Sequence, residues 1–104
     1  MTRVTFTTLI AELIRYANNH DIQVLIDWVL RDAETQHRLY LAGATKCDGH
    51  INRSRHQVGK AADIYIIVDH KISDDDEQYN FLHDYWDEIG GGPRIMGDLG
   101  HFEG

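Results

Sequence analysis

The chain has 104 residues, of which 42% are hydrophobic, and it carries a formal net charge of −7 with its histidines neutral. This length fits a single domain, residues 1–104, with a modest core. The negative charge disfavours nucleic acid and an anionic membrane surface as partners. The single cysteine, Cys47, excludes an internal disulfide and a metal site made only of cysteines.

The first quarter of the sequence predicts a helix followed by a strand. Residues 6–19 place apolar side chains at helical spacing, with Thr5 or Thr7 as the candidate N-cap. The polar run at 18–21 ends this helix. Residues 22–29 are rich in β-branched side chains and are bounded by polar ones, which is typical of a strand.

The middle of the chain predicts a second helix, a loop and a second strand. Residues 32–41 are the expected helix, with Gly43 as its C-terminal stop. The polar residues 44–55 predict a loop. Residues 62–68 give the clearest strand signal of the chain, and 69–70 predict a turn after it.

The last third predicts a third helix and a short final strand. The helix begins in the acidic run at 73–76 and ends before the Gly-Gly-Gly-Pro sequence at 90–93. The residues expected to point inward are Tyr79, Leu82, Tyr85, Trp86 and Ile89. A strand is expected around His101 and Phe102. The pattern predicts an α+β fold: a small antiparallel sheet with helices packed on one side.

Two histidines and an aspartate are candidate metal ligands. Six residues lie between His56 and Asp63, and among them Gly59 and the small pair at 61–62 permit a tight turn. His101 must come from an adjacent strand. Asp98 and His101 would point to the same side only if residues 98–101 are not a regular strand. Taken singly, each of these residues is more often a surface or turn residue. Taken together, three protein ligands would leave zinc one open position for water.

Other polar groups in the sequence have ordinary explanations. The pair Cys47 and His50 lacks a further cysteine and is expected in a loop. The acidic run 74–77 is expected as a helix N-terminus rather than a calcium site. The remaining histidines have no matching ligand partners in the sequence, and the two tryptophans are more often core residues than sugar-binding platforms. We expect surface positions for His20, His37, His70 and His83, and core positions for Trp28 and Trp86.

The spacing of these residues matches a known pattern. The sequence Ser-x-His-x-x-Gly-x-Ala-x-Asp at 54–63, followed by Asp-x-x-His-Phe at 98–102, resembles the M15 zinc peptidases. The Arg-Ser-x-His run at 53–56 and the Tyr-Trp-x-x-Ile-Gly-Gly segment at 85–91 resemble the small phage-encoded members. The resemblance implies a hedgehog/D-Ala-D-Ala peptidase-like fold.

The resemblance also implies roles for individual residues. His56, Asp63 and His101 would hold one Zn²⁺. Asp98 would be the general base that takes a proton from water, and Arg31 would stabilise the oxyanion. The chain would then be a zinc metallopeptidase that cleaves peptidoglycan stem peptides, either as an L-Ala-D-Glu endopeptidase or as a D-Ala-D-Ala carboxypeptidase.

The implied substrate contacts come from Arg53, Ser54 and Gln57. Glu103 follows on the same face as His101, where a hydrogen bond between them is expected. The N-terminus lacks the features of a secretory signal, so we expect the protein to be made in the host cytoplasm and to act on the cell wall after release. We also expect a monomer. A different class remains open: a non-catalytic, zinc-stabilised binding or virion-structural module with the same fold.

Overall fold

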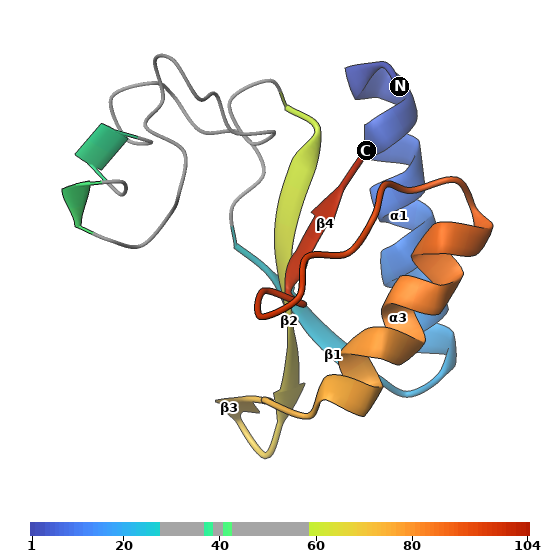
Figure 1. The fold of residues 1–104 in the computed structure, drawn as a ribbon. Helices are drawn as coiled ribbons and strands as arrows, with labels where there is room; N and C mark the ends of the chain where they lie inside the picture. The colour runs from blue at the N-terminus through green and yellow to red at the C-terminus, as the bar shows by residue number, and fades with distance from the viewer. Residues whose placement is uncertain (28–36, 39–40, 43–58) are drawn as a thin grey trace.

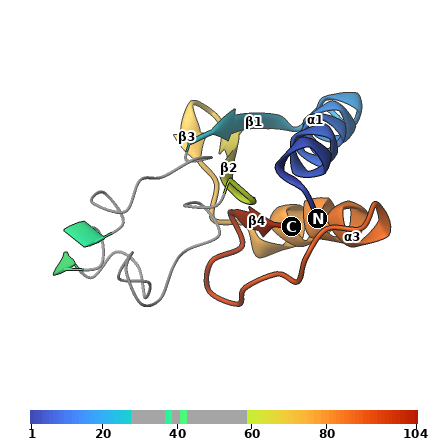
Figure 2. The same cartoon turned by 90° about the horizontal axis from the view of Figure 1, so that it is seen from above.

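The computed structural model describes residues 1–27, 37–38, 41–42 and 59–104. Two helices, α1 and α3, lie next to one another on one side of a small antiparallel sheet (Figures 1 and 2). The bounds are α1 Arg3–Asn19, β1 Gln23–Ile26, β2 Ala61–Val68, β3 Lys71–Ile72, α3 Asp76–Glu88 and β4 His101–Glu103. The predicted α+β class is confirmed.

Strand β2 is the centre of the sheet, and every other described strand pairs with it antiparallel. Its second half pairs with β1, in the register Leu25 to Tyr65. Its first half pairs with β4, in the register Asp63 to His101. Strand β3 adds a short hairpin that the sequence did not predict. The beginning of β2 is therefore the place where the final strand joins the sheet.

The two faces of β2 differ in burial. Ile64 and Ile66 face the helices and are each 1% exposed. Tyr65 and Ile67 point to the other face and are half-buried. Asp63 lies on this second face, because side chains alternate along a strand. The sheet thus separates the hydrophobic core from the face that carries the predicted metal ligand.

Helix α1 forms as its apolar spacing predicts, but it begins earlier than expected. Its N-cap is Thr2, whose hydroxyl accepts a hydrogen bond from the Thr5 amide, rather than Thr5 or Thr7. The threonine at position 2 starts the helix because it satisfies an amide that the first turn leaves free. The buried residues of α1 are Phe6, Ile10, Leu13 and Ala17.

Helix α3 begins in the acidic run, as predicted. Asp75 is its N-cap and accepts a hydrogen bond from the Glu77 amide. Tyr79, Leu82 and Trp86 are buried as expected, whereas Tyr85 and Ile89 are only partly buried. The two helices contact one another through an edge-to-face pair of Phe6 and Trp86 and a stacked pair of Tyr16 and Tyr85.

Some sequence expectations fall wholly or mostly outside the described residues. Of the helix predicted over 32–41, residues 37, 38 and 41 are described and are helical. Gly43, the loop over 44–55 and Trp28 lie outside the description. Within the part of the chain that the structure covers, no helix is long and apolar enough to cross a membrane.

Truncation of Leu82 tests the core between α3 and the sheet. Leu82 is completely buried, so Leu82→Ala should lower the free energy of unfolding by about 2–5 kcal/mol through lost burial and a cavity. Chemical denaturation followed by circular dichroism measures the loss. Val4→Ala on the exposed side of α1 is the matched control and should change stability by less than about 0.5 kcal/mol. Equal losses for both variants would contradict this core.

Candidate metal centre

Asp63 and His101 face one another across the pairing of β2 with β4. The Asp63 carbonyl accepts a hydrogen bond from the Asp27 amide on the β1 side, and the Ile64 amide donates to the Gly100 carbonyl on the β4 side. Asp63 and His101 are therefore a non-hydrogen-bonded pair, the kind whose side chains lie closest. Asp63 Oδ1 is 3.6 Å from His101 Nδ1.

This separation suits two ligands of one zinc ion. Ligand atoms at about 2.0–2.1 Å from zinc in a tetrahedral arrangement lie about 3.4 Å from one another. Asp63 and His101 are each 8% exposed, so both side chains are largely buried and held in place by their surroundings. Carboxylate oxygen and imidazole nitrogen are both common zinc ligands. The two described members of the predicted ligand set fit the metal.

Glu103 contacts the other nitrogen of the His101 ring. Its Oε1 is 3.0 Å from His101 Nε2, which confirms the hydrogen bond expected from alternation along the strand. A carboxylate there favours the proton on Nε2, so that Nδ1, which faces Asp63, is the nitrogen suited to bind a metal. Burial lowers the pKa of His101, but the Asp63 and Glu103 carboxylates outweigh it, so the pKa lies above its ordinary value.

Asp98 reaches this side of the sheet through a turn. An isolated bridge pairs Ile95 with Asp98, Gly97 adopts a φ of +83°, and the His101 amide donates to the Asp98 carbonyl. The prediction that residues 98–101 are not a regular strand is confirmed. Asp98 is exposed to solvent, and its negative charge contributes to the raised pKa of His101. A water-accessible carboxylate whose charge acts on His101 is a candidate proton acceptor.

Tyr65 lies on the same face as Asp63, two residues further along β2. Burial, followed by the charges of Asp63, Asp98 and Asp27, raises the pKa of its hydroxyl. A Cβ added to Gly100 would lie 2.8 Å from the Tyr65 ring. Position 100 is therefore restricted to glycine by the close approach of the turn to this ring.

Five predicted site residues lie outside the described residues: Arg31, Arg53, Ser54, His56 and Gln57. The candidate pair Cys47 and His50 lies there as well. Within residues 1–27, 37–38, 41–42 and 59–104, no group of three or more His, Cys, Asp or Glu side chains is arranged to hold a metal. The described residues therefore supply two of the three predicted ligands, and His56 remains a prediction.

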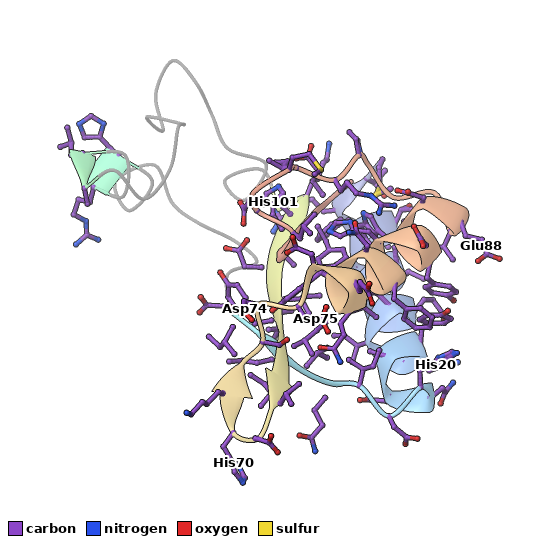
Figure 3. The ribbon with its side chains drawn as sticks, turned by 60° about the horizontal axis from the view of Figure 1, so that its bottom comes forward. His20, His70, Asp74, Asp75, Glu88 and His101 are labelled. Atoms are coloured by element: carbon purple, nitrogen blue, oxygen red, sulfur yellow. The ribbon has the colours of Figure 1, made fainter. Side chains whose placement is uncertain are left out.

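His83 was predicted at the surface, and this prediction is wrong. Its side chain is completely buried, and its Nε2 is 2.8 Å from the Leu99 carbonyl oxygen. The sequence held a signal for this, because Tyr79, His83 and Trp86 recur at helical spacing on one face of α3. By contrast His20 and His70 are exposed and His37 is partly exposed, and Figure 3 shows the first two well away from His101.

Comparison with known proteins gives structural relatives but no sequence relatives. No family model and no curated protein matches the sequence. The Serratia marcescens L-Ala D-Glu endopeptidase ChiX matches with a TM-score of 0.70 and 20% identity, covering 98% of this chain and 79% of the other.

Two further solved structures also match. A variant of the D,D-pentapeptidase VanY from a VanB-type resistance cassette, in complex with Zn(II), gives a TM-score of 0.67 at 18% identity, covering 96% of this chain and 70% of the other. VanYB in complex with D-alanine-D-alanine gives 0.64 at 19% identity, covering 96% and 69%. The chain has the fold of these peptidases, which confirms the predicted D-Ala-D-Ala peptidase-like architecture.

Proposed function

We propose that this protein is an M15-type zinc metallopeptidase that cleaves the stem peptides of bacterial peptidoglycan. The observation that carries the proposal is the close pair of Asp63 and His101, with the Asp98 carboxylate on the turn immediately before it. The fold shared with ChiX and VanY supports the same reading. VanY is a Zn(II) complex and VanYB holds D-alanine-D-alanine, which makes zinc and a stem peptide the proposed cofactor and substrate.

The proposed ligands are His56, Asp63 and His101. When bound, zinc supplies an acidified water and a positive charge that polarises the substrate carbonyl. Asp63 and His101 are held by the sheet, so their spacing is set before any cation binds. Glu103 holds His101 in the orientation that turns Nδ1 toward Asp63.

The chain's own residues would handle the protons and the negative charge. Asp98 accepts a proton from the attacking water and returns it to the leaving amine. Its exposure to solvent allows both water and substrate to reach it. Arg31 stabilises the oxyanion that forms at the scissile carbonyl. Ser54, with Arg53 and Gln57 beside it in the sequence, contributes hydrogen bonds to the stem peptide.

The bond that is cut has two candidates, the L-Ala-D-Glu bond and the terminal D-Ala-D-Ala bond. ChiX is an L-Ala D-Glu endopeptidase and VanY is a D,D-pentapeptidase, so the shared fold supports both. We propose a phage endolysin that is made in the host cytoplasm and acts on the wall after release as a monomer. These neighbours, ChiX and VanY, are peptidases, so the comparison does not favour the non-catalytic alternative.

Digestion of defined muropeptides tests the function directly. The purified protein should release fragments whose masses identify one cleaved bond, and a chelator should abolish the release because zinc holds the attacking water. Added Zn²⁺ after chelation should restore it. Mass spectrometry of the products is the measurement. Zinc binding without any cleavage of either bond would favour the non-catalytic module instead.

Asp98→Ala tests the proposed general base. Loss of a positioned proton acceptor should lower kcat by about 10²–10⁴-fold. Bound zinc should remain at one ion per chain, measured by metal analysis of the purified protein. Asp74→Ala, at an exposed aspartate on the segment before α3, is the control and should keep normal kcat. Near-normal turnover of Asp98→Ala would refute the assignment.

Glu103→Ala tests the carboxylate that supports His101. Removal of the hydrogen bond to Nε2 should weaken zinc binding by about 10–100-fold. Competition with a chromophoric chelator gives the affinity. Glu88→Ala, which removes an exposed carboxylate from the end of α3, should leave affinity unchanged. Equal affinities for the wild type and Glu103→Ala would show that Glu103 does not tune the metal ligand.

A further inference from the structure

Two side chains of helix α3 form hydrogen bonds with the backbone of the final segment of the chain. His83 Nε2 lies 2.8 Å from the Leu99 carbonyl oxygen, and Trp86 Nε1 donates to the Glu103 carbonyl at 2.9 Å. The two donors are three residues apart on the helix, so they lie on one face. Their acceptors lie on either side of His101. The helix therefore holds the backbone both before and after the proposed metal ligand.

The ring of His83 has little freedom. It stacks on Phe102 with ring centroids 4.0 Å apart and an angle of 9° between the planes. Phe102 in turn meets Trp86 edge to face, with centroids 5.9 Å apart. All three rings are fully buried. Close packing of this kind fixes the rotamer, and hence the direction of the Nε2–H bond.

The hydrogen bonding of His83 determines its proton position. Leu99 offers a carbonyl, which only accepts, so the proton is on Nε2. Nδ1 is then an unprotonated nitrogen, buried and without a hydrogen-bond partner among the described residues. Burial also lowers the pKa of His83, and this effect outweighs the hydrogen bond to the Leu99 carbonyl, which raises it. The lowered pKa favours the neutral ring.

An apolar side chain at position 83 would fill the same space with no buried nitrogen left unpaired. The histidine therefore costs stability at Nδ1, and what it provides is the donor to Leu99. Leu99 immediately follows Asp98 and lies two residues before His101. The same turn is closed by hydrogen bonds from the His101 amide to the Asp98 carbonyl and from the Ile64 amide to the Gly100 carbonyl.

We propose that His83 is a positioning residue that, through the Leu99 carbonyl, fixes the turn joining Asp98 to His101 in the geometry needed for metal binding and proton transfer. The inference rests on the proposed peptidase function for its catalytic readout. The structural role itself is simple: the N–H of the neutral His83 imidazole orients the peptide between Leu99 and Gly100. His83 touches neither the metal nor the substrate in this role.

Two substitutions separate the donor from the ring. His83→Phe keeps a flat ring against Phe102 but has no donor. His83→Gln loses the ring but carries an amide N–H at nearly the position of Nε2. Leu82→Ala, the neighbouring buried residue on α3, is the control for a general loss of packing. Metal affinity, kcat and KM on a muropeptide, melting temperature and hydrogen exchange of the His101 amide are measured for each.

The expected results differ between variants. His83→Phe should keep a melting temperature within a few degrees of the wild type, yet bind zinc about tenfold more weakly. Its kcat should fall at least about tenfold with KM little changed, because only positioning is lost. Its His101 amide should exchange faster. His83→Gln should restore most of the kcat and affinity, and Leu82→Ala should lower the melting temperature with little effect on zinc affinity.

Three outcomes would overturn the proposal: wild-type affinity and kcat in His83→Phe, equal defects in His83→Phe and His83→Gln, or the same loss of affinity in Leu82→Ala. If His83→Phe does not fold, His83→Met, which is apolar and flexible, takes its place. A wild-type protein that binds zinc but cleaves nothing refutes the peptidase function alone. Zinc affinity and hydrogen exchange then still decide the role of His83.

Discussion

The antiparallel pairing of β2 with β4 is the interaction on which the candidate site depends. It brings residue 63 next to residue 101, although 37 residues lie between them in the chain. The pair is of the non-hydrogen-bonded kind, so the two side chains approach one another closely. A shift of this register by one residue would turn His101 to the opposite face of the sheet. Register here has chemical as well as structural meaning.

Helix α3 stabilises that pairing from the core side. A strand of three residues forms few ladder hydrogen bonds of its own, so β4 needs support from elsewhere. Part of this support comes from Trp86, whose indole N–H donates to Glu103. The Trp86 ring also accounts for the glycine at position 91, since an added Cβ there would lie 2.1 Å from the indole nitrogen. The segment 85–91, noted first as a sequence resemblance, thus has a structural reason.

Much of the fold follows from local patterns in the sequence. The stripe in α1, the apolar run of β2 and the acidic start of α3 each reflect a periodicity or a capping preference that acts within a few residues. The break in the strand over 98–101 was predicted as well, since a regular strand would point Asp98 and His101 to opposite faces. Such features are predictable because their causes are local.

Two of the features that sequence reasoning missed, His83 and β3, depend on contacts with other segments, and the third is a choice between neighbouring threonines. Histidine is compatible with both surface and core, and His83 is buried because Phe102 and Leu99 lie against it. Strand β3 is two residues long and exists because it pairs with the end of β2. Thr2 was missed because its capping role depends on where the first turn begins.

The hairpin between β2 and β3 has a practical consequence. Asp69 and His70 both adopt left-handed backbone angles, with φ of 52° and 64°, which suits the twist of a two-residue connection but strains side chains larger than glycine. Figure 3 shows His70 at the end of the sheet remote from His101. The tip is exposed and its contacts are local. A fluorophore, an affinity tag or a fused domain attached there would leave the end of the sheet that carries Asp63 and His101 unobstructed.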